Sequence, residues 1–314
     1  MKPLIEPWNN SITQGYFPCG WLILILIVAW LALFSGINTI PVEQHEAYVL
    51  QTAREMSRNG DFIVPYFNDQ PRMNKPPLNY WLTMTASALD PFTDDIEPWH
   101  GRIWSMIGCL LLLVATLRIG DILYGAPAGF LASALLLGTK GFVDFSHDAR
   151  PDCLYSVLCV LMLYAWIAAW RSVDDSCRQK LFALVSWIFA GLAVLSKGPQ
   201  VPAVLLAGFL LFLVAAREHS RIFKILRPFS GIPLCLAICL PWWFLLKHRV
   251  ALLGIDFSKT QLSGSLLTNI SGLREIFGFF YVSRLLNILL PVSLLLPLLA
   301  YLNRKKFSKA ISNI

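Results

Sequence analysis

Charged residues are scarce in this chain of 314 residues: Asp, Glu, Lys and Arg make up 14% of it, whereas a soluble domain carries roughly a quarter. Hydrophobic residues make up 56%, and the mean hydropathy is +0.59. They gather in runs that approach the roughly 20 residues needed to span a bilayer. The runs are 21–38, 103–117, 122–139, 153–170, 181–196, 200–216, 230–246 and 279–302. The scarcity of charge excludes a soluble domain and predicts an all-α polytopic membrane protein of about eight transmembrane helices.

Paired-cysteine motifs are also missing. None of the seven cysteines forms a C-x-x-C pair, so we predict neither a zinc site nor a disulfide framework. His147 lies beside Asp144 and Asp148, but without a second histidine or cysteine nearby this is a weak metal pattern. We expect no metal and no cofactor, because the sequence does not support a divalent ion.

No aromatic and basic recognition motif accompanies the net charge of +7, so nucleic acid is not an expected partner. Half of the 26 basic residues fall in the shorter loops and tails on one side of the runs, with few acids beside them. Short cytoplasmic loops are rich in Lys and Arg, so the N-terminus is expected inside and residues 39–102 outside. Run 21–38 lacks a small-residue cleavage site and is expected to stay as the first span. The expected organisation is a cytoplasmic tail (1–20), a membrane domain (21–302) with its fourth outer loop at 247–278, and a second tail (303–314).

Residues 39–81 form the most polar long stretch before the C-terminal tail. Their spacing predicts a helix over 42–58 that stops at Asn59-Gly60. Glu46 falls on the apolar stripe of this helix, with Val42, Val49, Ala53 and Met56, and His45 lies at its edge. A bare buried carboxylate is costly, so Glu46 is either paired or kept for chemistry. Alternatively, the helix lies flat on the membrane and Glu46 reaches water.

Lys75 precedes Pro76-Pro77, which fix the backbone around it. A lysine held on a rigid corner at a membrane surface suits a phosphate, although a lysine that merely reaches the interface fits the same residues. A second helix over 78–89 is too short to span a bilayer and is expected at the interface, with Tyr80 and Trp81 at headgroup level.

Charges cluster at the outer ends of several spans rather than at their centres. Arg150 and Asp152 flank the start of one span, as simple partners or as cavity groups, and Lys197 tops two others. Arg284 lies inside the last run, where an arginine needs an anion or a carbonyl. The outer set is Glu46, Lys75, Arg102, Lys140, Arg150, Asp152, Lys197 and Arg284. Several cations with one or two acids suit a lipid head group whose phosphate leaves while an acid deprotonates a hydroxyl.

The order HEAYVLQTAREM, GDFIVPYFNDQPRMNKPPLNYW, ARPD, SKGP and PWW resembles bacterial membrane glycosyltransferases of the GT-C class, over residues 20 to 300. These include the aminoarabinose transferases that modify lipid A and relatives of the protein O-mannosyltransferases. The resemblance implies a GT-C-like helix bundle with amphipathic helices in the first outer loop. It also implies transfer of a hexosyl or pentosyl group from a polyprenyl-phosphate sugar to a glycolipid, of the lipid A or lipopolysaccharide type, or to a protein. The reaction would take place on the periplasmic side of the inner membrane.

The resemblance also implies roles for residues. The family's Asp-Glu pair, whose aspartate is the proposed base, falls on His45 and Glu46, so the first acid is replaced here. Either Glu46 or His45 serves as base, or the chain is a divergent member; we favour Glu46. Lys75 matches the donor-phosphate ligand, with Lys197 and Arg284 as further candidates. The chain is also shorter than typical members.

Two other functions remain open from sequence. A lipid-linked-sugar binding or transport protein without chemistry would tolerate Glu46→Gln but not loss of Lys75 or Arg284. A structural subunit would dock a partner through the surface of residues 39–102 and tolerate loss of single cavity charges.

Overall fold

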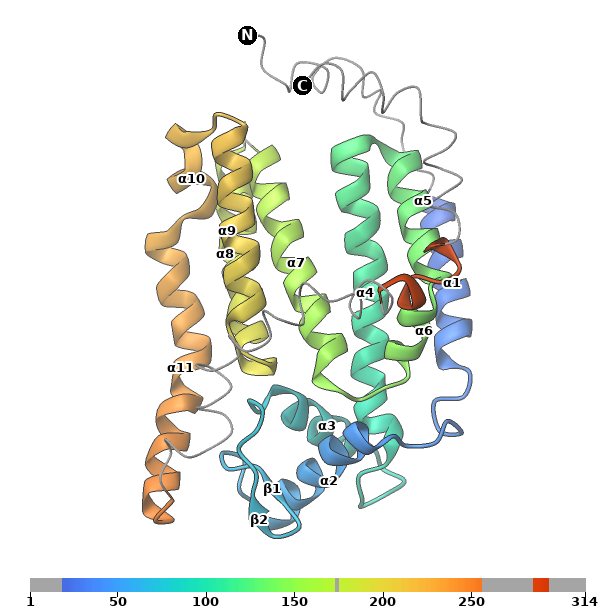
Figure 1. Ribbon diagram of the computed structural model, residues 1–314, viewed down its shortest axis with the longest axis vertical. Helices are drawn as coiled ribbons and strands as arrows, with labels where there is room; N and C mark the ends of the chain where they lie inside the picture. Colours follow the sequence, from blue (N-terminus) through green and yellow to red (C-terminus); the bar gives the residue numbers. More distant parts are fainter. Residues whose placement is uncertain (1–18, 173–174, 256–284, 294–314) are drawn as a thin grey trace.

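The fold is a bundle of long helices with a small platform at one end (Figure 1), seen in a computed structural model that describes residues 19–172, 175–255 and 285–293. The bundle helices are α1 (Cys19–Phe34), α4 (Pro98–Tyr124), α5 (Ala126–Leu137), α6 (Lys140–Ser146), α7 (Pro151–Arg171), α8 (Ser176–Ser196), α9 (Gln200–Ala215), α10 (Ile222–Leu226) and α11 (Pro228–Leu252). A short 3-10 turn, η2 (His219–Arg221), precedes α10. The all-α polytopic membrane fold predicted from the apolar runs is confirmed.

Four helical segments in the described part of the chain are long and apolar enough to cross a membrane: α4, α7, α8 and the η2–α11 segment. The pair α5 and α6 passes together as a fifth, although it bends by 64°. Helices α1 and α9 are apolar but shorter, and most of run 279–302 lies outside the described residues. The number of eight spans therefore stays a prediction.

Helix α4 packs closely against α5 through two glycines. A Cβ at Gly129 would lie 2.3 Å from the carbonyl oxygen of Leu117, and one at Gly120 would lie 2.5 Å from the Cα of Gly129. Only glycine allows the two backbones to approach this closely, as at other helix contacts within membranes.

The platform consists of α2 (Gln44–Asn59), the hairpin β1 (Tyr66–Phe67) and β2 (Gln70–Pro71), and α3 (Leu78–Ala88). It lies across the lower end of α4 and α7 in Figure 1. Helix α2 ends where Gly60 adopts a left-handed conformation (φ 63°), and α3 begins directly after Pro77. Both predicted helices, 42–58 and 78–89, are thus confirmed to within two residues.

The apolar stripe that the spacing predicted for α2 is buried, with α3 as its main neighbour. Val49, Ala53 and Met56 are buried with Tyr80 of α3, whereas Val42, before the helix, is exposed. The ring of Tyr80 completes this core, and the expectation that Tyr80 and Trp81 lie at headgroup level stays a prediction. Burial raises the pKa of Tyr80 to about 12.

The hairpin turn is fixed by a carboxylate from α2. Asn68 and Asp69 both have positive φ, as a tight two-residue hairpin turn requires. Their backbone N–H groups donate to Glu55, at 2.8 and 3.0 Å. The segment that follows the hairpin, which carries Arg72 and Lys75, is therefore held at a set height above α2.

Candidate functional site

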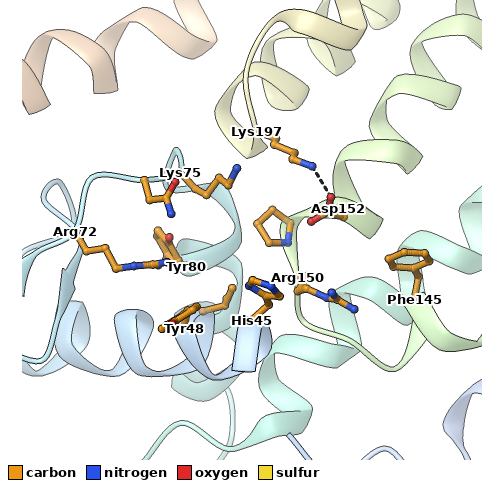
Figure 2. Close-up of a pocket in the computed structure, with 12 residues that line it drawn as sticks. His45, Tyr48, Arg72, Lys75, Tyr80, Phe145, Arg150, Asp152 and Lys197 are labelled. Carbon is orange, nitrogen blue, oxygen red and sulfur yellow. Dashed lines mark hydrogen bonds and ion pairs between the residues drawn. The ribbon is translucent and has the colours of Figure 1, made fainter. Parts of the chain in front are cut away.

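A cavity of about 420 Å³ lies between the platform and the ends of the bundle helices. Its walls come from α2, from the segment between β2 and α3, from α3 and α6, from the start of α7 and from the residue after α8 (Figure 2). The lining residues are His45, Tyr48, Val49, Arg72, Asn74, Lys75, Tyr80, Phe145, Arg150, Pro151, Asp152 and Lys197. Among these described residues, four are cations and one is a carboxylate, so the cavity is suited to an anion.

Lys75 faces the cavity without a counter-ion. No carboxylate among the described residues pairs with its ammonium group, although Lys197 and Asp152 act on it from across the cavity. Burial, and then the charge of Lys197, lower the pKa of Lys75. A half-buried ammonium group in this state gains most from a ligand that brings negative charge.

Arg72 is the cavity cation that the sequence analysis missed. Its guanidinium lies 4.3 Å from the centroid of the Tyr48 ring and 5.6 Å from that of Phe67, as a cation–π stack. No carboxylate in the described part of the chain pairs with it. Stacking fixes the plane of the guanidinium and leaves its N–H groups free for a planar or phosphate-like anion. The only sequence signal was its place three residues before Lys75.

Asp152 forms an ion pair with Lys197 (Figure 2). The backbone after Lys197 is held by Tyr155 of α7, whose hydroxyl donates to the carbonyl of Gly198 and accepts from the N–H of Val201, both at 3.0 Å. Two elements distant in sequence therefore bring this pair into the cavity wall together.

Arg150 does not pair with Asp152, contrary to one of the sequence alternatives. Its guanidinium donates to Asp148, and Glu43 lies 3.6 Å away. Burial raises the pKa of Asp148, and Arg150 acts in the opposite direction. Arg150 is therefore already neutralised, which leaves Arg72 and Lys75 as the lining cations without a carboxylate among the described residues.

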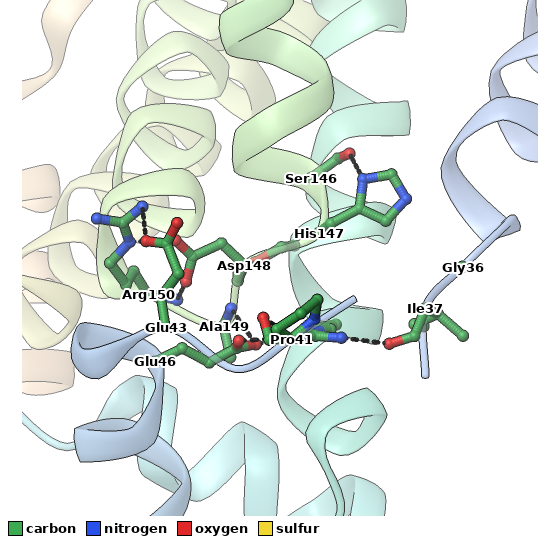
Figure 3. Close-up of polar contacts among 12 residues, drawn as sticks. Gly36, Ile37, Pro41, Glu43, Glu46, Ser146, His147, Asp148, Ala149 and Arg150 are labelled. Atoms are coloured by element: carbon green, nitrogen blue, oxygen red, sulfur yellow. Dashed lines mark hydrogen bonds and ion pairs between the residues drawn. The ribbon is translucent and has the colours of Figure 1, made fainter. Parts of the chain in front are cut away.

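His45 and Glu46 are neighbours in sequence but lie in different surroundings. His45 is exposed and lines the cavity, whereas the side chain of Glu46 is only 2% exposed. Glu46 accepts from Nε and Nη2 of Arg102, both at 2.7 Å, and from the N–H of Ala149 at 3.2 Å (Figure 3). These contacts use its two oxygens within the protein. The role of base predicted for Glu46 stays a prediction, and its surroundings favour a structural role.

Arg102 is fully buried and does not line the cavity. Besides Glu46, it donates to the carbonyls of Ile37 at 2.6 Å and Pro41 at 3.4 Å. Its neighbour Gly101 lies so close to Ala149 that a Cβ there would be 2.4 Å from the alanine Cβ. The Glu46–Arg102 pair thus joins α2, α4 and the segment that leads into α7, and so fixes three parts of the cavity wall.

Residues 74–244, more than half of the chain, match the family model described as dolichyl-phosphate-mannose-protein mannosyltransferase. The chain belongs to this family. The matched residues include Lys75, Arg150, Asp152 and Lys197, and they exclude α2 and Arg72.

The similarity of this mannosyltransferase family member to individual curated relatives is modest. It is 28% identical, over 79% of its length, to the undecaprenyl phosphate-alpha-4-amino-4-deoxy-L-arabinose arabinosyl transferase 1 of Proteus mirabilis, and covers 43% of that protein. It is also 28% identical to an uncharacterized protein of Aquifex aeolicus, over 73% of its length and 44% of the relative. The chain thus spans less than half the length of the curated relatives it matches.

Solved structures show the same fold. The crystal structure of ArnT from Cupriavidus metallidurans bound to undecaprenyl phosphate matches with a TM-score of 0.75 at 19% identity, over 91% of this chain and 52% of that one. The apo structure of the same protein matches with a TM-score of 0.70 at 18% identity, over 89% and 50%. At this level of identity, the match establishes the fold.

Two predicted site residues remain, Lys140 and Arg284, together with the weak metal pattern at His147. Lys140 pairs with Asp144 at 3.0 Å, is exposed, and is not among the cavity-lining residues. Arg284 lies outside the described residues. Within the described ranges, no group of three His, Cys, Asp or Glu side chains could hold a metal ion. The ring nitrogens of His147 lie within hydrogen-bond distance of Ser146 and of the carbonyl of Ser35.

Proposed function

We propose that the chain transfers a sugar from a polyprenyl-phosphate donor to a hydroxyl acceptor at the outer surface of the cell inner membrane. The observation that carries this proposal is the cavity in which Arg72 and Lys75 lack a carboxylate partner among the described residues. Membership of a mannosyltransferase family supports it, and so does the fold shared with a protein whose structure contains undecaprenyl phosphate.

The chemistry requires a place for a departing phosphate. The acceptor oxygen attacks the anomeric carbon, the bond from that carbon to the phosphate oxygen breaks, and polyprenyl phosphate leaves with the electron pair. Arg72, Lys75 and Lys197 would neutralise the negative charge that grows on the phosphate, which is where preorganised cations lower a barrier most. Lys197 would exchange its present partner Asp152 for the phosphate, and water could then solvate Asp152, which is half-buried.

A base must take the proton of the attacking hydroxyl. Glu46 is occupied by Arg102, and Asp152 is paired with Lys197. His45 lines the cavity, is exposed, and accepts no hydrogen bond within the described part of the chain. An imidazole is the side chain that most often serves as general base in proteins. We therefore assign this role to His45 and keep Glu46 as the residue that positions its helix.

The transferred group would be a hexose or pentose. The acceptor would be a glycolipid of the lipid A or lipopolysaccharide type, or a protein, and the cavity would open on the periplasmic side. The pentose and the hexose or protein assignments rest on the names of the relative and of the family. The glycolipid acceptor rests on the resemblance of the sequence motifs, and the periplasmic side rests on the distribution of basic residues between the spans.

The test is release of polyprenyl phosphate by the detergent-purified chain given a radiolabelled polyprenyl-phosphate sugar and a hydroxyl acceptor. Lys75→Met should weaken donor binding about 10- to 150-fold, the value of one hydrogen bond to a charged group. Lys140→Met is the matched control, since that lysine is exposed and is not among the cavity-lining residues. His45→Gln should abolish turnover while donor binding persists.

Two results would contradict the proposal. Equal donor affinity in the Lys75→Met and wild-type chains would show that the donor phosphate does not bind in this cavity. Donor binding without turnover, under every acceptor tried, would make the chain a binding protein for lipid-linked sugar rather than a transferase.

A further inference from the structure

A basic elbow joins α9 to α11 at the end of the bundle opposite the platform (Figure 1). We define the elbow as residues 217–229, which include η2 and α10. Because α9 and α11 are apolar and run along the bundle, their connection lies where the bundle meets the membrane surface. This surface is the one away from the cavity.

The elbow carries cations that the described protein does not neutralise. Its single acid, Glu218, accepts from Arg221 at 2.8 Å and from the indole N–H of Trp170 at 3.3 Å. No carboxylate in the described ranges pairs with Arg217, Lys224 or Arg227. In addition, Nε of Arg227 is buried and has no hydrogen-bond partner among the described residues. The described protein therefore leaves the charge of Arg227 uncompensated.

Two exposed aromatic rings lie beside these cations. Phe223 is 63% exposed and Phe229 is 84% exposed. Their rings stack on each other, with centroids 5.8 Å apart and planes at 12°. Exposed phenylalanines next to lysine and arginine are typical of segments that insert among lipid head groups.

The elbow is held in a fixed orientation. The indole N–H of Trp187, in α8, donates to the carbonyl of Leu226 at 2.7 Å. Trp187 fits there because Gly231 has no side chain: a Cβ at that position would lie 1.9 Å from the indole ring. Arg227 itself adopts a left-handed conformation (φ 45°), which turns the chain sharply into α11. Cations and rings are therefore presented together rather than on a loose loop.

We propose that the elbow binds the head group of an anionic phospholipid in the membrane leaflet opposite the cavity. The lipid phosphate accepts from Arg227 and Lys224, and the stacked rings of Phe223 and Phe229 lie among the upper acyl carbons. Lysine and arginine near an anionic bilayer surface each strengthen binding, and the exposed rings add an apolar contribution. This site is separate from the proposed sugar transfer and does not depend on it.

The experiment is native mass spectrometry of the full chain, released from detergent with phosphatidylglycerol or phosphatidylcholine. The wild-type chain should retain phosphatidylglycerol in preference to phosphatidylcholine. The Lys224→Gln/Arg227→Gln variant should bind phosphatidylglycerol about 25-fold less tightly, roughly fivefold for each lost cation. The matched control is Arg178→Gln/Lys180→Gln at the start of α8, two exposed cations at the same end of the bundle. This control should change the affinity by less than about twofold, because Arg178 and Lys180 lie outside the elbow and the lost contacts to the lipid phosphate are those of Lys224 and Arg227.

The single variant Lys224→Gln should fold normally, because this side chain is exposed. Its loss should still lower the affinity for phosphatidylglycerol about fivefold. Phosphatidylglycerol bound equally by the elbow variants and the wild-type chain would overturn the proposal. An equal loss of phosphatidylglycerol affinity in the α8 control would show that general surface charge, and not the elbow, binds the lipid, and would also overturn the proposal. If glycerol 3-phosphate alone saturates the elbow of the wild-type chain, the ligand is a soluble phosphate ester instead of a lipid, and the proposal is overturned.

Discussion

Replacing Glu46 by glutamine tests whether this buried carboxylate of the platform is a structural partner of Arg102 or the catalytic base. The side chain of Glu46 is 2% exposed and that of Arg102 is 0% exposed, and they are joined by two hydrogen bonds of 2.7 Å. Glutamine keeps the volume but removes the charge and turns one acceptor into a donor that faces a guanidinium N–H. Breaking a buried pair in this way costs about 3–5 kcal/mol, because the remaining charge stays buried without compensation.

The measurement is the unfolding of the purified chain in mixed micelles, followed as loss of helical signal with increasing denaturing detergent. Glu46→Gln should lose much of the total stability, which is about 5–15 kcal/mol for an ordinary domain. Glu43→Gln is the matched control, since its side chain is 72% exposed and should change stability by less than about 0.5 kcal/mol. The double variant Glu46→Gln/Arg102→Met should recover at least half of the loss, because the unpaired guanidinium is gone.

The opposite result has a definite meaning. A Glu46→Gln chain that is as stable as the wild type, binds donor and yet releases no polyprenyl phosphate would refute the structural role. It would restore Glu46 as the base, as the sequence alone predicted.

Three further predictions concern the cavity and the helix contacts. Because burial lowers the pKa of Lys75, its ammonium group loses its charge at a lower pH than an ordinary lysine does, so donor affinity should already fall as pH rises below the usual range of lysine. In a pH series of donor Kd values, Lys75→Arg, whose guanidinium keeps its charge, should shift this fall to higher pH. Gly129→Val should lower the free energy of unfolding, measured in a thermal unfolding assay, by about 3 kcal/mol or more, because a Cβ there meets a backbone carbonyl of α4. Gly208→Val is the control and should change this free energy little, because a Cβ at Gly208 has nothing within 4 Å. Arg72→Lys should raise the KM for donor about fivefold with little change in kcat, because lysine loses the flat stack on Tyr48; an unchanged KM would show that this stack does not serve the donor.

Much of the fold follows from local patterns. The apolar runs predicted the bundle helices, the stripe of Val49, Ala53 and Met56 predicted the buried face of α2, and Asn59-Gly60 predicted its end. Each of these features depends on residues within a few positions of one another. The number of spans was harder to establish, because length and hydropathy do not separate a full crossing from a bent or short apolar helix.

The site was predicted less completely, because its charges are decided by long-range partners. Lys75 was found from Pro76-Pro77, which are adjacent to it. Glu46 was recognised as unusual, but its partner Arg102 lies 56 positions further on and no local spacing connects them. Arg72 was missed for the same reason: its stack on Tyr48 exists only once the hairpin has folded over α2.

The surplus of positive charge in the cavity also has a consequence for handling the protein. Cations that face one another across an empty space repel, so the cavity is most strained when no anion is present. Under the proposed function, polyprenyl phosphate bound in the cavity would relieve this repulsion and would stabilise the folded chain by an amount that grows with the logarithm of its concentration over its Kd. We therefore expect the protein to leave the membrane with lipid phosphate still bound and to lose stability as detergent washes it out. Added polyprenyl phosphate would then be the natural stabiliser for purification and crystallisation.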